Sequence, residues 1–142
     1  MSSTQPLCHL VGINSQKLSK NENILLEAEL FSRLCEELKN IFRQQYKRYF
    51  DLLKFDMEME NAMLEASFLR FLLNDILLTE EYSLEGIAYY TQIPEDVICD
   101  VMAGTNTAPS LPLSRKIIDL HRSVKPDLYR ELIKNILEKY MV

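Results

Sequence analysis

The residues with catalytic or metal-binding chemistry are few in this chain and stand far apart. The two histidines are His9 and His121, and the three cysteines are Cys8, Cys35 and Cys99. The adjacent Cys8 and His9 are a conceivable metal-ligand pair, but a zinc site needs more ligands and no second pair stands at a suitable spacing. His121 lies near the end of a predicted helix, where a capping or dipole role is expected. We therefore predict no metal site and no cofactor.

Sequence motifs of the common enzyme classes do not occur. The chain has no P-loop, dinucleotide-binding, zincin or nucleophile-elbow motif, and its three glycines disfavour a loop that cradles phosphate. The carboxylate pairs Glu36-Glu37 and Glu80-Glu81 are adjacent, so on a helix their side chains diverge by about 100°. We therefore expect that the protein is not an enzyme.

Composition describes a globular chain of 142 residues, with 47% hydrophobic and 26% charged residues. No apolar run approaches the roughly 20 residues that span a bilayer, so we expect no membrane association. An odd, widely spaced set of three cysteines fits a reducing compartment. No basic residue precedes Lys17, which is untypical of a secretory signal. Together these features predict a cytoplasmic protein.

The formal net charge of −5 is unevenly distributed. Residues 39–54 carry five basic residues and one acid, whereas residues 80–125 carry seven acids and four basic residues. An anionic partner would meet the first stretch more readily than the second. Residues 39–54 could thus attract nucleic acid or an anionic lipid surface directly.

Apolar spacing predicts an all-α chain in three parts. Residues 1–20 show no period and predict a disordered or loosely docked leader. Residues 21–60 contain leucines and aromatic residues three or four apart, from Asn23 to about Met57, which predicts a long amphipathic helix. Such a helix must either fold back or pair with a second copy, and we favour an oligomerisation arm that forms a homodimer. Residues 61–142 form the remaining domain.

Local capping signals divide residues 61–142 into further helices. An apolar pattern from Glu58 to Leu78 spans a wide arc and predicts a buried helix. Ser83 caps a short helix from Leu84 to Thr91, and Gln92-Ile93 form a turn. The segments that follow are a helix from Pro94 to Ala103 ended by Gly104, a helix capped by Ser110 that runs to Val124, and a final helix from Asp127 to Tyr140.

The spacing of small and apolar residues across this region resembles the helix-turn-helix of the lambda-repressor-like family. The resemblance covers about residues 65–125, with Leu69–Leu78 as the first helix. Ala88 supplies the small residue at which the two short helices cross. The fold it implies is a lambda-repressor-like helix-turn-helix core, flanked by the long N-terminal helix and a C-terminal helix. The matching residues are Ile87-Ala88, Ile93, Ile98, Val101, Gly104, Pro109-Ser110 and Leu113 to Leu120.

This resemblance implies a DNA-binding transcriptional regulator. By analogy, the residues that face the bases are Glu95, Asp96, Cys99 and Asp100. Those that position the DNA backbone are Gln92, Thr105, Asn106, Thr107, Arg115 and Lys116, with Arg122 beside them.

Two departures from the family pattern bear on this function. Gln92 stands where the family has Gly in the turn, and Gln adopts the left-handed conformation less readily. The base-facing positions include three acids, which repel phosphates although a carboxylate can accept a hydrogen bond from cytosine N4. The alternative function is therefore a protein interaction adaptor or anti-regulator, whose acidic helix contacts a basic protein partner.

Overall fold

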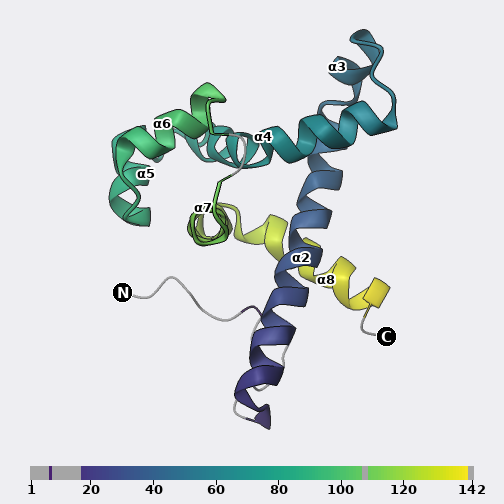
Figure 1. Cartoon of the computed structure of the whole chain (residues 1–142), viewed down its shortest axis with the longest axis vertical. Coiled ribbons are helices and arrows are strands. Elements are labelled where there is room, and N and C mark those ends of the chain that lie inside the picture. The colour runs from purple at the N-terminus through teal and green to yellow at the C-terminus, as the bar shows by residue number, and fades with distance from the viewer. Residues whose placement is uncertain (1–6, 8–16, 107–108, 141–142) are drawn as a thin grey trace. The chain divides into compact units, whose positions relative to one another are not determined.

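The computed structural model describes Leu7, residues 17–106 and residues 109–140, and its regular secondary structure in these ranges is helical. No strand occurs in these ranges, which confirms the prediction of an all-α chain. Figure 1 labels the helices. Their bounds are α2 (Lys20–Gln45), α3 (Lys47–Leu52), α4 (Met57–Leu78), α5 (Leu84–Thr91), α6 (Glu95–Ala103), α7 (Leu111–Val124) and α8 (Pro126–Tyr140).

Two compact units share the chain. One unit contains residues 1–41 and 126–142, and the other contains residues 42–125. Helix α8 thus belongs with most of α2 and not with the helices that directly precede it. The predicted boundaries after residues 20 and 60 describe a different division and stay predictions. Within the described ranges, no helix combines the length and the apolar character needed to cross a bilayer.

In the first unit, α2 begins at a capping box and buries a stripe of leucines. The backbone N–H of Glu22 donates to Ser19 Oγ at 3.1 Å, and the N–H of Ser19 donates to Glu22 Oε1 at 2.9 Å. This reciprocal pair satisfies two donors at the helix start. The three leucines at every fourth position, Leu30, Leu34 and Leu38, are no more than 1% exposed.

Helix α8 buries its own apolar stripe in the same unit. Lys139 Nζ lies 3.1 Å from Glu37 Oε2, which joins the end of α8 to α2. The apolar stripes of α2 and α8 are both buried within a single chain, so neither requires a second copy to cover it. The buried residues of α8 are Tyr129, Leu132, Ile133 and Ile136.

In the second unit, the helix predicted to reach about Met57 is broken. Helix α2 ends at Gln45, Tyr46 has φ −102° and ψ 12°, and α3 adds only six residues. Lys54 then has a left-handed φ of 60°. The chain therefore turns back before α4 begins, and the prediction of one continuous helix is wrong at this point.

Aromatic contacts explain the break. The Tyr46 ring stacks on Phe71 of α4 with 4.6 Å between ring centroids, and Phe42 lies 5.4 Å from the same ring. Beyond the turn, Phe50 is buried and stacks on Phe55 at 5.9 Å. The apolar period continues through these residues, so it cannot reveal that their rings pack back against a later helix.

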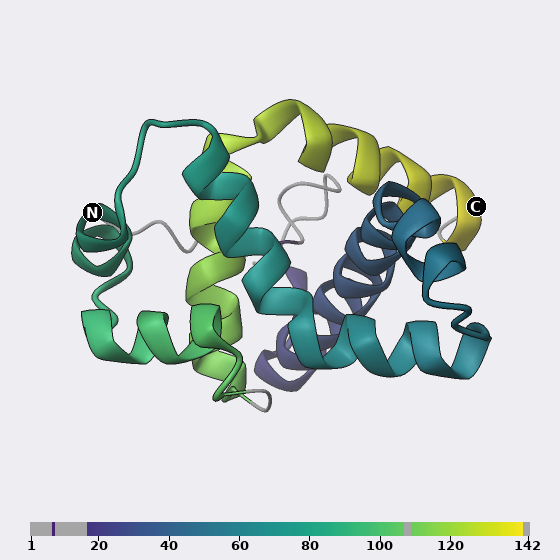
Figure 2. The ribbon, with the colours of Figure 1, turned by 90° about the horizontal axis from the view of Figure 1, so that it is seen from above.

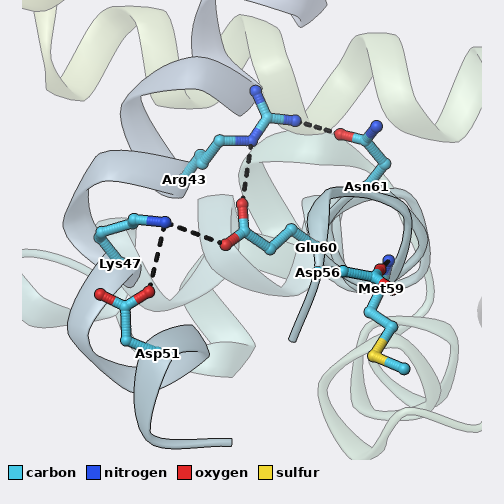
Figure 3. Close-up of polar contacts among 7 residues, drawn as sticks. All are labelled: Arg43, Lys47, Asp51, Asp56, Met59, Glu60 and Asn61. Carbon is cyan, nitrogen blue, oxygen red and sulfur yellow. Dashed lines mark hydrogen bonds and ion pairs between the residues drawn. The ribbon is translucent and has the colours of Figure 1, made fainter. Parts of the chain in front are cut away.

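Polar contacts reinforce the same turn (Figure 3). Glu60 of α4 is 2% exposed, and its carboxylate lies 3.7 Å from Arg43 Nε and 3.3 Å from Lys47 Nζ. Lys47 Nζ also lies 3.2 Å from Asp51 Oδ1. The carboxylates of Asp51 and Glu60 raise the pKa of Lys47, and Asp51 has the larger effect. Arg43 also donates to the side-chain oxygen of Asn61. The buried carboxylate thus joins the end of α2 and the start of α3 to α4.

The remaining helices of the second unit pack around the later part of α4. Helix α7 lies beside α4, and α5 and α6 lie next to them, as Figure 2 shows. The wide apolar arc predicted for α4 is buried in part, since Met59 near its start is 50% exposed and Leu78 at its end is 75% exposed. Its buried apolar residues are Leu64, Phe68, Leu69, Phe71, Leu72, Leu73 and Ile76.

Candidate interaction surface on helices α5 to α7

Helix α5 is a short helix whose start and end are set by its own polar side chains. Ser83 Oγ accepts a hydrogen bond from the backbone N–H of Gly86 at 3.1 Å, which confirms the predicted N-cap. Thr91 Oγ1 donates to the Ile87 carbonyl at 2.6 Å and accepts from the N–H of Ile93 at 3.4 Å. Thr91 therefore fixes the chain where it leaves α5.

The turn between α5 and α6 depends on one left-handed residue. Gln92 has φ 59° and ψ 31°, a left-handed conformation that favours Gly. The family pattern has Gly at this position of the turn, so a left-handed residue was expected here. Pro94 is the N-cap of α6, one position before its predicted place at the helix start. At the other end, Gly104 has φ 80° and ends α6 as predicted.

Apolar residues fill the angle between the two short helices. Ile87 and Ile98 are fully buried, and Ile93 and Val101 are no more than 5% exposed. Ala88, the residue predicted to lie at the crossing, is half-buried. Helices α5 and α6 pack on each other, α5 also packs on α7, and α6 on α4. The outer face of α6 is therefore held in a defined position by a buried core.

The outer face of α6 is acidic. The predicted base-facing residues, Glu95, Asp96, Cys99 and Asp100, are all exposed. None of the three carboxylates has an ion pair within the part of the chain that the structure describes. Glu95 and Asp96 lie in the first turn of α6, where the helix dipole favours negative charge. The face can therefore offer charge to a cation without first breaking a contact.

The arginines of α7 are directed to an internal carboxylate. Asp119 is 3% exposed, and its Oδ1 lies 3.3 Å from Arg115 Nε and 3.5 Å from Arg122 NH2. Their guanidinium groups thus compensate a buried charge, which was not predicted from the sequence. Lys116 between them is exposed and is the cation that α7 presents to solvent.

The other predicted backbone-positioning residues are dispersed. Gln92 is exposed in the turn, and Asn106 is half-buried in the loop after α6. Thr105 Oγ1 donates to the Asp100 carbonyl at 3.0 Å, so this side chain closes the end of α6. Thr107 lies outside the described residues. The structure thus brings no group of basic side chains to the acidic face.

His121 has a different role from the one expected at a helix end. It is fully buried, and its Nε2 lies 2.8 Å from Asp75 Oδ2 of α4. This hydrogen bond is the largest cause of a lowered pKa of Asp75. His121 and Asp75 are 46 positions apart, so helical periodicity could not predict that they pair.

Three tyrosines form an exposed cluster on and beside α5, which was not singled out from the sequence. The rings of Tyr82 and Tyr90 lie 5.3 Å apart, and those of Tyr89 and Tyr90 lie 5.4 Å apart. Tyr89 is 79% exposed and Tyr90 is 64% exposed. Tyr89 and Tyr90 are adjacent on α5 and Tyr82 stands just before its N-cap, so helical periodicity does not group the three rings. Exposed aromatic rings are suited to binding the side chains of Arg or Lys.

Metal ligands do not converge in the described ranges, where no three His, Cys, Asp or Glu side chains lie close enough to hold an ion. Cys8 and His9, from which no metal site was predicted, lie outside those ranges. Comparisons of the whole chain with protein-family models, with curated proteins and with solved structures found no match.

Proposed function

We propose that residues 65–125 form a helix-turn-helix unit similar to that of the lambda-repressor-like family, and that α6 of this unit binds a basic surface of another protein. One observation carries the proposal. Glu95, Asp96 and Asp100 are exposed on α6 and have no ion pair within the described residues. The protein then acts as an interaction adaptor or anti-regulator, and it needs no cofactor for this role.

Electrostatics disfavour duplex DNA as the partner of this face. Phosphates approaching α6 would meet three carboxylates, and each repels a phosphate at short range. Arg115 and Arg122 are engaged with buried Asp119, so using them for phosphates would leave that carboxylate uncompensated. A basic protein surface meets the opposite situation, because its cations gain the carboxylates as partners.

The tyrosine cluster, defined as Tyr82, Tyr89 and Tyr90, supports a partner that carries Arg. A guanidinium group can stack on an exposed ring while its N–H groups donate to a carboxylate. The cluster belongs to α5 and the segment before it, and α5 packs directly on α6. Aromatic rings and carboxylates are thus available on neighbouring helices.

DNA-binding regulation is the second candidate function, favoured by the backbone of α5 and α6. Two short helices separated by a left-handed residue, with Gly104 ending the second, are typical of helix-turn-helix units. Under this function, base contacts come from Glu95, Asp96 or Asp100 and phosphate contacts come from Lys116.

Amide-resolved NMR titrations separate the two functions. The probes are an Arg-rich peptide and a duplex DNA of random sequence, each added at low and at high salt. We expect the peptide to shift the backbone amides of α6, and the duplex to leave them unchanged even at low salt. Duplex-induced shifts in α6 at low salt that disappear in Lys116→Glu would overturn the proposal in favour of DNA binding.

Charge reversal tests whether the α6 carboxylates carry the binding. Asp96→Lys combined with Asp100→Lys should weaken binding of the Arg-rich peptide by about tenfold or more, because attraction becomes repulsion. The matched control is Glu131→Lys with Glu138→Lys on α8, which changes the net charge equally at exposed positions of the other unit. Equal weakening by the control would show that total charge, and not α6, governs binding.

A further inference from the structure

A cavity lies between α4 and the turn that connects α2 to α3, entirely within the second unit. Its volume is about 210 Å³, below the roughly 300 Å³ at which pockets for drug-sized ligands begin. The cavity thus suits a small ligand. Its lining residues are Tyr46, Tyr49, Phe50, Met63, Ser67, Arg70, Phe71 and Asn74.

The walls of this cavity are held by contacts among the residues that line it and by ion pairs beside it. Tyr46 is stacked on Phe71, and Tyr49 contacts Phe50 with 6.2 Å between ring centroids. On the same turn, Arg43 and Lys47 converge on the buried Glu60 (Figure 3). The aromatic side of the cavity is therefore already formed before any ligand enters, which lowers the entropic cost of binding.

Arg70 is the charged residue among those that line the cavity. Its side chain is half-buried and has no ion pair or hydrogen bond within the described residues. One guanidinium nitrogen, NH1, lies 3.2 Å from the position that a Cβ would occupy at Gly104. No acid is among the described residues that line the cavity, and nearby Glu60 is compensated by Arg43 and Lys47. An unpaired, partly desolvated guanidinium is unusual in a folded protein and favours an anion as its partner.

We propose that this cavity binds a small aromatic carboxylate. The guanidinium of Arg70 would bind the carboxylate with paired N–H donors, and the Asn74 amide stands on the same face of α4 to donate a further hydrogen bond. The rings of Tyr46, Tyr49 and Phe50 would contact the ligand ring, and the Met63 thioether suits such a contact. The cavity shares no residue with the acidic face of α6, so each proposal can fail without the other.

Benzoate and benzamide are the probes that test this inference. They have the same ring and nearly the same shape, but only benzoate carries a charge that Arg70 can bind. We expect benzoate at millimolar concentration to shift amides of α3 and of the middle of α4, and benzamide to bind about tenfold or more weakly. Equal binding of the two probes, or benzoate shifts elsewhere in the chain, would overturn the proposal.

Inorganic phosphate tests whether the aromatic ring matters. Phosphate supplies charge without an apolar body, so we expect no comparable shift at the same concentration. If phosphate binds as well as benzoate, the site is a simple anion site and the proposed ligand class is wrong.

Substitution of Arg70 tests the residue that carries the specificity. Arg70→Gln should remove the preference for benzoate over benzamide, and Arg70→Lys should keep part of it, because charge remains but the paired donors are lost. Arg48→Gln is the matched control, since Arg48 is an exposed cation of α3 that does not line the cavity. An unchanged preference in a folded Arg70→Gln protein would overturn the proposal, and so would loss of the preference in the control.

Discussion

At the scale of single residues, His121 joins two helices through one hydrogen bond to Asp75. Because the hydrogen bond from His121 stabilises the ionised carboxylate, it lowers the pKa of Asp75, and the charges of His121 and Lys125 add to this effect. Partial burial of Asp75 opposes it. The folded chain therefore holds the Asp75 carboxylate ionised to lower pH than the unfolded chain does.

This lowered pKa predicts a defined pH dependence of stability. The stabilisation is complete above the ordinary carboxyl pKa and is lost as the pH falls through the lowered pKa of the folded state. We expect Asp75→Asn to reduce the free energy of unfolding by about 1 to 2 kcal/mol at neutral pH, and by progressively less in acid. Urea unfolding followed by circular dichroism at several pH values measures this difference.

Asp127→Asn is the control for that measurement. Asp127 pairs with Arg130 at 2.6 Å, but both side chains are more than 75% exposed, and exposed ion pairs contribute little. Its substitution should change stability only slightly at any pH. A loss in Asp75→Asn that stays constant into strong acid would show that the hydrogen bond, and not the ionisation, matters.

At the scale of elements, α5 and α6 each end at one left-handed residue, Gln92 and Gly104 respectively. The left-handed conformation costs about 1 kcal/mol at Gln92, because its Cβ is crowded there. Gly104 has no Cβ and adopts the same conformation without this cost. The ends of α5 and α6 are thus set by backbone conformation at two single positions. A change at either position should alter stability without altering the acidic face.

Opposite substitutions at these two positions should have opposite effects. Gln92→Gly should raise the free energy of unfolding by up to about 1 kcal/mol, the relief of strain being partly offset by the freedom of Gly in the unfolded chain. Gly104→Ala should lower it by about 1 to 2 kcal/mol, since Ala is strained at φ 80° and its Cβ would lie 3.2 Å from Arg70. Thermal and urea unfolding measure both, and destabilisation by Gln92→Gly would contradict the left-handed turn.

At the scale of the whole molecule, burial of the leucine stripe of α2 bears on whether two chains pair. A homodimer was predicted because the leucine stripe of α2 needs a cover. Leu30, Leu34 and Leu38 are buried within one chain, so this need is met without a partner. Exposed apolar residues remain at the start of α2, where Ile24 is 58% exposed and Leu25 is 70% exposed.

We therefore expect single chains in solution at micromolar concentration. Sedimentation velocity or light scattering after gel filtration gives the mass directly. If a dimer is found, Ile24→Ser with Leu25→Ser should dissociate it, since these are the apolar residues of α2 left uncovered. A dimer that survives this change would place the interface elsewhere.

Local signals made much of the candidate surface predictable. Ser83, Gly104 and Ser110 were expected to bound helices, and each does so in the structure. The exposure of Glu95, Asp96 and Asp100 was also expected, because they alternate with apolar residues at helical spacing. These features depend on contacts within three to five residues, which the order of the amino acids largely determines.

Partners distant in sequence were not predictable in the same way. The break at Tyr46 follows from its stacking on Phe71, and the position of Glu60 follows from Arg43 and Lys47 on two other helices. Helical periodicity marks such residues as apolar or charged without identifying what they meet.

The sequence by itself determined the helical class, most helix boundaries and the acidic character of α6. Only the tertiary structure decided that His121 meets Asp75 and that Arg70, beside an aromatic cavity, has no ion pair or hydrogen bond among the described residues. The physical reason is the distance along the chain over which each feature is determined. Helix caps and apolar periods depend on residues a few positions apart. Burial and ion pairing depend instead on which helices the folded chain brings together.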